Sequence, residues 1–337
     1  MLQWLAVVCS RFDSSHNRRT RLPAYPLTFS PMLSITFLGT AASIPTIDRN
    51  VAGLAVHREG ETILFDCGEG NQRQMMRYGV GFGFREIFFT HYHADHILGV
   101  TGLLRTMGLQ DRSSPVLLYG PRGAQRVLGA AIALGIERNK FPIEILEIKP
   151  GDRLARDEYD IVVFETEHRA DTVGYALVEH PRLGRFNPDR ARALGIPEGP
   201  LWGQLHKGQT VTLGDGRTIG PGELVGGPRP GRILVYTGDT RPHLSVIQAS
   251  RGADLLVHEA TFGGDEAERA SETGHSTAAE AARVALEAGV RRLVLTHISS
   301  RYNRDTSELL AEAKAVFPDT TIARDGMTLD VPYADAD

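Results

Sequence analysis

The sequence predicts an α/β protein built in layers. Short apolar runs with the β-branched and aromatic character of strands recur along the chain. Between them lie segments whose apolar residues are spaced as on one face of a helix. With 42% hydrophobic and 23% charged residues among 337, the chain is long enough to bury a substantial core. This mixture of strands and helices favours a layered α/β domain over an all-β one.

Each expected element follows from this pattern. The expected strands are short apolar runs: Ile35–Leu38, Val51–Val56, Thr62–Phe65, Glu86–Phe89, Val116–Tyr119, Ile143–Ile148, Ile161–Phe164, Val173–Val178, Ile233–Tyr236, Leu255–Val257 and Leu293–Leu295. The expected helices have helical apolar spacing: Gly70–Tyr78, Ile97–Met107, Arg122–Leu134, Pro242–Ser250, Ser276–Ala288 and Thr306–Val316. The expected helix Ser276–Ala288 has the clearest boundaries, because Glu280 stands at a capping-box position and Gly289 follows the last turn.

Composition restricts the class of protein. The formal net charge of −4 argues against a protein that coats nucleic acid through global charge, although it allows a local basic patch. No apolar run is long enough for a transmembrane helix. Cys9 and Cys67 cannot build a disulfide framework, so a reducing cytoplasm is the expected location. Residues 1–31 are expected to be a flexible extension, with the folded domain spanning 32–337, because the apolar and basic segments stand in the wrong order for a signal peptide.

A cluster of histidines and a carboxylate is the strongest indication of function in the sequence. His91, His93, Asp95 and His96 follow directly on the apolar run that ends at Phe89. In an extended segment alternate side chains share a face, so His91 and His93 can hold one metal ion. Asp95 and His96 are adjacent and would turn toward a second ion. The alternative, solvated loop histidines, is disfavoured because the cluster lies between an expected strand and an expected helix.

Other potential ligands also follow expected strands. His168, Asp239 and His297 each come within a few residues of the end of an apolar run. Loops that follow strands can present side chains from a rigid scaffold at one edge of a sheet. These three residues are therefore expected to join the histidine cluster.

Several stretches together resemble the metallo-β-lactamase superfamily, and within it the tRNase Z family of tRNA 3′-processing endoribonucleases. The metal-binding stretches are His91–His96, Val235–Arg241 and Thr296–His297, and His168 stands alone. Four stretches are closer to tRNase Z than to other relatives: Phe65–Gly70, His258–Phe262, Gly274–Thr277 and His297–Tyr302. The resemblance runs in order over residues 33–333.

The resemblance implies a four-layer αββα sandwich with two Zn²⁺ ions per subunit. In it His91, His93 and His168 would hold the first ion, Asp95, His96 and His297 the second, and Asp239 would bridge them. Imidazole and carboxylate ligands suit zinc, and a dinuclear site suits phosphoester hydrolysis, while Mn²⁺ or another divalent ion is also compatible. The implied activity is removal of the 3′ trailer from precursor tRNA by hydrolysis after the discriminator nucleotide. The resemblance also implies a homodimer.

Candidate catalytic residues stand beside these ligands. Asp95 is the expected proton acceptor, which would generate and orient the attacking hydroxide. Glu259 and His275 are expected to position or protonate the leaving group, or else to orient a metal-binding histidine by hydrogen bonding. Asp66 could support the ligands in the same way or simply form a turn. Cys67 is expected to be a buried, unreactive side chain.

An insertion at about 180–210 resembles the arm with which the tRNase Z family grips tRNA. Basic residues outnumber acidic ones on this Gly- and Pro-rich segment, which suits contact with a phosphate backbone. Its expected substrate-binding residues are Arg185, Arg190, Arg192 and Lys207. An ordinary solvated hairpin is the alternative.

One loop departs from the family pattern. Where the family often has Pro-x-Lys-x-Arg-Asn, a loop tied to handling of the tRNA 3′ end, this chain has Ile47 in place of the lysine. How strictly the protein rejects tRNAs that already end in CCA is therefore open. Two rival functions are a hydrolase of small phosphodiesters or other esters, which needs no arm, and a non-catalytic RNA-binding protein, which would be expected to have a broken ligand set.

Overall fold

The computed structural model describes residues 32–136 and 138–334, and the predicted extension, residues 1–31, lies outside them. Two seven-stranded sheets form the centre of the fold. The first has the order β16 (Thr328–Asp330), β1 (Leu33–Gly39), β2 (Gly53–Arg58), β3 (Glu61–Phe65), β4 (Glu86–Phe88), β5 (Val116–Gly120) and β6 (Ile143–Glu147). The second has the order β15 (Thr320–Ile322), β14 (Leu293–Thr296), β13 (Leu255–Glu259), β12 (Ile233–Tyr236), β9 (Val173–Glu179), β8 (Tyr159–Glu165) and β7 (Arg153–Ala155).

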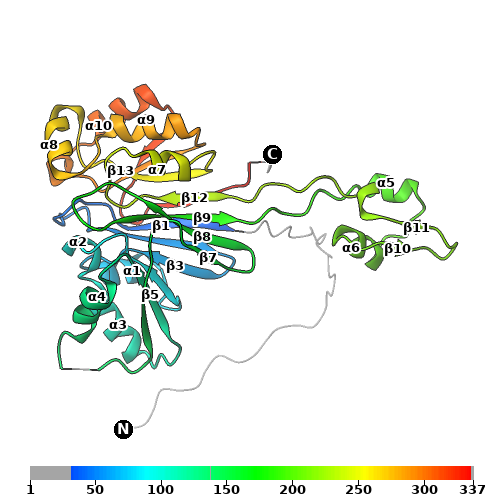
Figure 1. Cartoon of the computed structure of the whole chain (residues 1–337), viewed down its shortest axis with the longest axis horizontal. Coiled ribbons are helices and arrows are strands. Elements are labelled where there is room, and N and C mark those ends of the chain that lie inside the picture. Colours follow the sequence, from blue (N-terminus) through cyan, green and yellow to red (C-terminus); the bar gives the residue numbers. More distant parts are fainter. Residues whose placement is uncertain (1–31, 137, 335–337) are drawn as a thin grey trace, which may run out of the picture. The chain divides into compact units, whose positions relative to one another are not determined.

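Helices cover the outer face of each sheet (Figure 1). On the first sheet these are α1 (Asn71–Tyr78), α2 (Ala94–Ile97), α3 (Val100–Leu109) and α4 (Ala124–Ala133). On the second they are α7 (Leu244–Ala249), α9 (Ala278–Ala288) and α10 (Ser307–Val316), and α8 (Ala267–Thr273) precedes α9. The layers run helix, sheet, sheet, helix, which confirms the predicted αββα sandwich. None of the helices within the described ranges has the length and apolar character needed to cross a membrane.

The central strands are apolar throughout because both of their faces are buried. In β12, Leu234 and Tyr236 pack between the two sheets, whereas Val235 packs against the outer helices. In β13, Leu255 and Val257 pack between the sheets in the same way. Each outer helix in turn buries one apolar face, as Ala281 and Ala285 of α9 do. The alternation of the strands thus builds separate apolar cores on the two faces of each sheet.

One predicted helix is wrong at its start. The segment Ile97–Met107 was expected to be one helix, but α2 already begins at Ala94 and a new helix starts at Val100. Asp95 and His96 therefore lie on a helical turn and not on the extended segment that the sequence suggested. At the break, the backbone N–H of Gly99 donates to the carbonyl oxygen of Cys67 at 2.9 Å and not to the preceding helical turn. Only glycine fits there, because a Cβ would lie 2.0 Å from the carbonyl oxygen of Gly68.

A long excursion leaves the sandwich between β9 and β12. It runs from His180 to Gly231, so the predicted arm, at about 180–210, is part of it; residues 180–231 are called the arm below. It contains α5 (Pro188–Ala193), α6 (Pro200–His206), β10 (Val211–Thr212), β11 (Thr218–Ile219) and a short 3₁₀ turn, η1 (Pro221–Glu223). The arm has an apolar cluster of its own, made by Ala191, Ile196, Leu205, Val211, Leu213, Ile219 and Leu224. Such a cluster lets the arm keep its own structure.

Candidate metal centre and catalytic site

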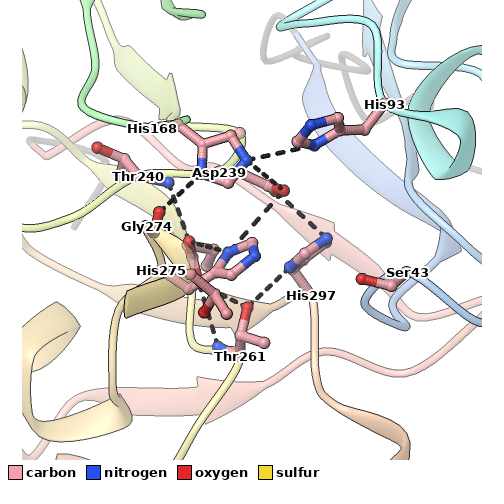
Figure 2. A network of polar contacts seen from close by, with 12 residues as sticks. Ser43, His93, His168, Asp239, Thr240, Thr261, Gly274, His275 and His297 are labelled. Atoms are coloured by element: carbon pink, nitrogen blue, oxygen red, sulfur yellow. Dashed lines mark hydrogen bonds and ion pairs between the residues drawn. The ribbon is translucent and has the colours of Figure 1, made fainter. Parts of the chain in front are cut away.

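The candidate site lies where strands of both sheets end. His91 follows β4, His168 follows β8, Asp239 follows β12 and His297 comes directly after β14. Strands β12, β13 and β14 are parallel, so the loops after them meet at one edge of the second sheet. Figure 2 shows His93, His168, Asp239, His275 and His297 directed toward one another from several different loops. The fold thus brings together residues that stand up to 206 positions apart, from His91 to His297.

A first group of potential ligands consists of His91, His93, His168 and Asp239. One donor atom from each lies within 4.8 Å of the others. Nδ1 of His93 is 2.9 Å from Nε2 of His91 and 3.3 Å from Nε2 of His168. Oδ2 of Asp239 is 3.6 Å from Nε2 of His91. These are the residues expected for the first ion, together with the expected bridging carboxylate.

A second group consists of Asp95, His96 and His297. Nε2 of His297 lies 3.3 Å from Oδ2 of Asp95, and it lies 3.3 Å from Oδ1 of Asp239 as well. Nε2 of His96 is 3.4 Å from the same Asp239 oxygen. Asp239 therefore directs one carboxylate oxygen toward each group, the arrangement that a bridging ligand requires.

The donor set fits divalent metal ions. Nε2 of His96 and Oδ1 of Asp239 are fully buried and have no hydrogen-bond partner among the described residues. Buried polar atoms are almost always paired, so two such atoms directed at one point indicate a missing partner. Imidazole nitrogens and carboxylate oxygens are ligands that zinc and similar divalent ions accept. The fold and the cluster together support binding of divalent metal.

Two groups of the cluster, His91 and Asp239, already have the charge that metal binding requires. Burial, with the neighbouring His96, lowers the pKa of His91 well below its usual value and favours the neutral imidazole that binds metal. Burial alone would raise the pKa of Asp239, but His297 and His96 hold that pKa well below its usual range. Asp239 is therefore a carboxylate at neutral pH.

Hydrogen bonds to Nδ1 of the histidines fix which imidazole nitrogen faces the candidate metal centre. Oδ2 of Asp66 accepts hydrogen bonds from Nδ1 of His96 and from the hydroxyl of Tyr236, both at 2.8 Å. Thr90 donates its hydroxyl to Asp66 and accepts from Nδ1 of His91 at 3.1 Å. Nε2 of both histidines is thereby left for the centre. Asp66 therefore supports the ligands, and its φ of 57° is the left-handed conformation in which the chain leaves β3.

Two further histidines, His168 and His297, are also held through Nδ1. Nδ1 of His168 donates to the carbonyl oxygen of Gly274 at 2.7 Å. Thr261 donates its hydroxyl to Glu259 and accepts from Nδ1 of His297 at 2.8 Å. No separate role for Thr90, Thr261 or Gly274 could be predicted from the sequence, although the last two fall in stretches that resemble tRNase Z. Cys67, as expected, is fully buried, and burial raises the pKa of its thiol to about 12.

Glu259 and His275 form a buried pair beside the cluster. Oε1 of Glu259 accepts from Nδ1 of His275 at 2.8 Å and from the backbone N–H of Thr240 at 2.9 Å, while Oε2 accepts from Thr261 (Figure 2). Burial opposes protonation of His275, but Glu259 outweighs it and raises the pKa of His275 to about 9. The His275 ring stacks on that of His297, 5.3 Å away. A protonated imidazole thus stands next to the potential ligands.

Asp95 is held by the loop that follows β1. Its Oδ2 accepts the backbone N–H of Ser43 at 2.7 Å, and Ser43 adopts a φ of 56° in the loop after β1. Burial would raise the pKa of Asp95, but His96 and His297 hold it well below the usual range. Asp95 is 9% exposed, compared with 1% for Asp239. It is therefore an ionised, buried carboxylate that is more exposed than Asp239.

The loop that departs from the family pattern lies beside a cavity. Arg49 is buried and donates to the hydroxyl of Thr40 and the carbonyl of Ala323, whereas Ile47 is fully exposed. The cavity, of about 750 Å³, is bordered by this loop and by exposed arginines, among them Arg73 and Arg304. The substitution at Ile47 therefore changes an exposed side chain and not the support of the loop.

The four predicted tRNA-binding residues lie on the arm, and none belongs to the cluster of potential ligands. Arg190 and Lys207 are exposed. Arg192 is exposed as well, but its guanidinium pairs with Glu198 and Asp189, each at 2.9 Å. Arg185 precedes Phe186, whose ring packs near that of Trp202, 5.3 Å away. The arm therefore carries basic side chains on a small folded support.

Comparisons with known proteins agree with this architecture. A profile described as "Beta-lactamase superfamily domain" matches residues 204–298, and one described as "Anti-Pycsar protein Apyc1" matches residues 33–182. The crystal structure of the short form of human tRNase Z superimposes with a TM-score of 0.65 at 27% identity. That match covers 89% of this chain and 99% of the human one.

Relatives with higher identity span nearly the whole described chain. Ribonuclease Z of Gemmatimonas aurantiaca is 57% identical over 301 residues, which cover 89% of this chain and 96% of that protein. Ribonuclease Z of Myxococcus xanthus is 55% identical over 305 residues, 90% of this chain and 99% of the relative. With the αββα sandwich and the clustered histidines and carboxylates, this degree of identity shows that the chain belongs to the ribonuclease Z family.

Proposed function

We propose that this protein removes the 3′ trailer from precursor tRNA by hydrolysing the phosphodiester that follows the discriminator nucleotide. Its family membership makes it an endoribonuclease of tRNA 3′ processing. The observation that carries the finer proposal is the pair of ligand groups that share Asp239. Attack by water would leave a 3′-hydroxyl on the tRNA and a 5′-phosphate on the trailer.

We assign two divalent ions, Zn²⁺ in the first instance, to these groups. His91, His93 and His168 would hold one ion, Asp95, His96 and His297 the other, and Asp239 would bridge them. The two orphaned atoms, Nε2 of His96 and Oδ1 of Asp239, support this assignment. When bound, the ions neutralise phosphoryl charge and lower the pKa of water.

Asp95 has the geometry of the residue that accepts the proton from the attacking water. One of its oxygens is held by Ser43, so the carboxylate keeps a fixed direction. Its depressed pKa keeps it ionised and able to accept a hydrogen bond at neutral pH. Asp95 would thus orient the nucleophile as well as contribute to the second ligand group.

His275 is the better of the two candidates for the proton donor. Both oxygens of Glu259 already accept hydrogen bonds, which leaves that side chain an acceptor. Nδ1 of His275 donates to Glu259, and the imidazole is the group of the pair that can release a proton to the 3′-oxygen as the P–O bond breaks. Glu259 would hold His275 in position and, through Thr261, also orient His297.

The arm would hold the tRNA body away from the scissile bond. Arg185, Arg190, Arg192 and Lys207 supply cations for phosphate contacts. Arg192 would have to exchange its pairing with Glu198 and Asp189 for a phosphate, whereas Arg190 and Lys207 are exposed. The homodimer implied by the family resemblance is part of this proposal, because one subunit's arm can then serve the other's site.

The deciding experiment maps cleavage products. Zinc-loaded protein is incubated with a precursor tRNA that carries a 3′ extension, and both new ends are determined. We expect a tRNA that ends at the discriminator nucleotide with a 3′-hydroxyl, and a trailer with a 5′-phosphate. A 2′,3′-cyclic phosphate end would rule out attack by water. Binding without cleavage would favour the non-catalytic alternative, and hydrolysis of small diesters alone would favour the other rival.

A further inference from the structure

The two stems of the arm run side by side where they leave the sandwich. The backbone N–H of Glu179, at the end of β9, donates to the carbonyl of Arg232 at 2.9 Å. Further out, Arg182 and Arg229 exchange backbone hydrogen bonds of 2.7 and 2.9 Å. Gly231 is needed for this approach, because a Cβ there would lie 2.4 Å from the carbonyl oxygen of Glu179. The direction of the arm is therefore set at a narrow base.

A buried ion pair fixes one stem to the sandwich. Arg232 is 2% exposed and binds both carboxylate oxygens of Glu179, at 2.7 and 2.8 Å. Its Nη1 also donates to the carbonyl oxygen of Val331, in the segment that follows β16, at 3.1 Å. Such a bidentate arginine–carboxylate pair has a defined geometry. Arg232 is thus a rigid point next to the base of the arm.

Tyr333 connects this rigid point to the other stem. The carbon of the Arg232 guanidinium lies 4.1 Å from the centre of the Tyr333 ring, and that of Arg182 lies 3.3 Å from it. Tyr333 is 6% exposed. Guanidinium groups stack favourably on aromatic faces, more strongly when they are shielded from water. Tyr333 therefore contacts Arg232, beside the sandwich, and Arg182, on the arm.

We propose that Tyr333 is a positioning residue for tRNA, which restrains the arm through its contacts with Arg182 and Arg232. This inference rests on the proposed role of the arm in holding tRNA. A change of angle at the base moves the far end of the arm through a larger distance, so a contact at the base controls the arm efficiently. An arm that is already oriented loses less conformational entropy when tRNA binds.

The restraint can be measured without any substrate. The chain has two tryptophans, Trp4 and Trp202, and Trp202 lies in the arm on α6. In a Trp4→Phe background, the time-resolved fluorescence anisotropy of Trp202 reports nanosecond motion of the arm. We expect Tyr333→Ala to increase the amplitude of this motion, and Tyr333→Phe, which keeps the ring, to leave it at the level of the parent protein.

Kinetics separate positioning from catalysis. For zinc-loaded protein acting on precursor tRNA, we expect Tyr333→Ala to raise KM roughly three- to tenfold, the range expected for the loss of two stacking contacts. The kcat value and the hydrolysis of bis(p-nitrophenyl) phosphate should hardly change. Tyr333→Phe should restore the parent KM. If Tyr333→Ala does not fold, Arg182→Gln removes one of the stacked guanidinium groups and should change anisotropy and KM in the same direction.

A matched control tests for general loss of stability. Phe141 is also 6% exposed and also lies beneath an arginine, Arg112, at 5.6 Å, but it belongs to the core that packs around α3 and α4. Phe141→Ala should leave the anisotropy of Trp202 and the KM for tRNA unchanged. The inference is overturned if Tyr333→Ala changes neither quantity, or if Phe141→Ala changes both equally. If the parent protein fails to cleave precursor tRNA, the proposed function falls, while the anisotropy still decides the restraint.

Discussion

At the site, two carboxylates are each linked to a histidine by hydrogen bonds through a threonine. Asp66 acts on His91 through Thr90, and Glu259 acts on His297 through Thr261. In both links the threonine donates to the carboxylate and must accept from the imidazole, which fixes the imidazole tautomer. Asp66, which follows β3 of the first sheet, also binds His96 directly, whereas Glu259 lies at the end of β13 in the second sheet. Asp95 and His168 are instead held by the backbone of loops, at Ser43 and Gly274.

The role of Asp95 can be tested by substitution. Asp95→Ala is expected to remain folded and to bind tRNA, because the side chain lies outside the apolar cores. Its rate should fall by about 10²–10⁴-fold, the range lost with a positioned acid or base. Single-turnover cleavage, gel-shift binding and thermal unfolding measure the three quantities. Near-normal turnover by a metal-loaded variant would remove Asp95 from the mechanism.

The role of His275 depends on the leaving group. An RNA 3′-oxygen needs a proton as it departs, whereas p-nitrophenolate does not. His275→Ala should therefore reduce precursor tRNA cleavage by about 10²-fold and barely affect bis(p-nitrophenyl) phosphate hydrolysis. Equal losses with both substrates would assign His275 a structural role.

The proton on His275 should also determine how tRNA cleavage depends on pH. With a pKa of about 9, His275 loses its proton as the pH rises above that value, so cleavage of tRNA should decline on the alkaline side. Glu259 raises this pKa, so Glu259→Gln should move the decline to lower pH. The pH profile of single-turnover rates measures the shift. An alkaline limb that Glu259→Gln leaves in place would contradict the pairing.

At the scale of elements, close backbone packing shapes the catalytic loop. Gly99 separates α2 from α3 and lies against Gly68, which in turn approaches the backbone of Asp95: a Cβ on Gly68 would lie 2.2 Å from the Asp95 carbonyl oxygen. The turn that carries Asp95 and His96 is therefore pressed against the loop after β3, where Asp66 lies. Two glycines thus set the distance between a ligand and the carboxylate that supports it.

This packing predicts a contrast between two glycine substitutions. Gly99 has ordinary helical dihedral angles, so Gly99→Ala introduces no backbone strain, and its effect must come from the clash with Gly68. We expect the free energy of unfolding to fall by about 1–3 kcal/mol. Gly81→Ala is the control, because a Cβ there meets no atom of the described residues within 4 Å. Its effect should stay within about 0.5 kcal/mol. Urea unfolding measures both, and equal effects would refute the steric explanation.

The elements differ in how far the sequence could predict them. Long apolar strands such as β8 and β9, and α9 with its capping box at Thr277 and Glu280, have strong local signals. The strands β7, β15 and β16 are three residues each, too short for alternation to show, and the arm's β10 and β11 are shorter still. The start of α2 was missed because it depends on tertiary packing against Gly68. The potential ligands could be predicted because they follow strands, whereas the threonine links depend on contacts between distant segments.

At the scale of the whole molecule, a charged network joins the two sheets away from the metal centre. Arg58, at the end of β2 in the first sheet, donates to Glu179, at the end of β9 in the second, at 2.9 Å. Glu179 also pairs with Arg232, and all three side chains are buried. A buried charge that loses its partner is strongly destabilising. This network therefore holds the sandwich together at the base of the arm.

The network predicts a pH-dependent stability. Burial would raise the pKa of Glu179, but its hydrogen bonds with Arg232 lower that pKa below the ordinary 4.5. A group whose pKa is lower in the folded state contributes stability that is present above pH 4.5 and lost as the pH falls through the folded value. Glu179→Gln should cost about 3–5 kcal/mol at neutral pH. Urea unfolding at neutral and acidic pH should show the difference from the parent shrinking below pH 4.5, and a constant difference would contradict the network.

The arm should be separable from the catalytic body, because it has its own apolar cluster and its stems already touch. Deleting 184–206 would remove Ala191, Ile196 and Leu205 but leave the rest of that cluster exposed. Gly184 and Gly226 offer a better junction, since a Cβ on Gly184 would lie 1.9 Å from the carbonyl oxygen of Gly226.

Excising residues 185–225 and joining these glycines leaves the Arg182–Arg229 backbone pair available to close the base. We expect this variant to hydrolyse bis(p-nitrophenyl) phosphate at nearly the parent rate, because every potential ligand lies outside the excised segment. Precursor tRNA cleavage should fall by orders of magnitude, mainly through KM, because phosphate contacts supply much of the affinity for nucleic acid. A folded variant that loses both activities to the same extent would show that the arm supports the catalytic body and does not hold tRNA.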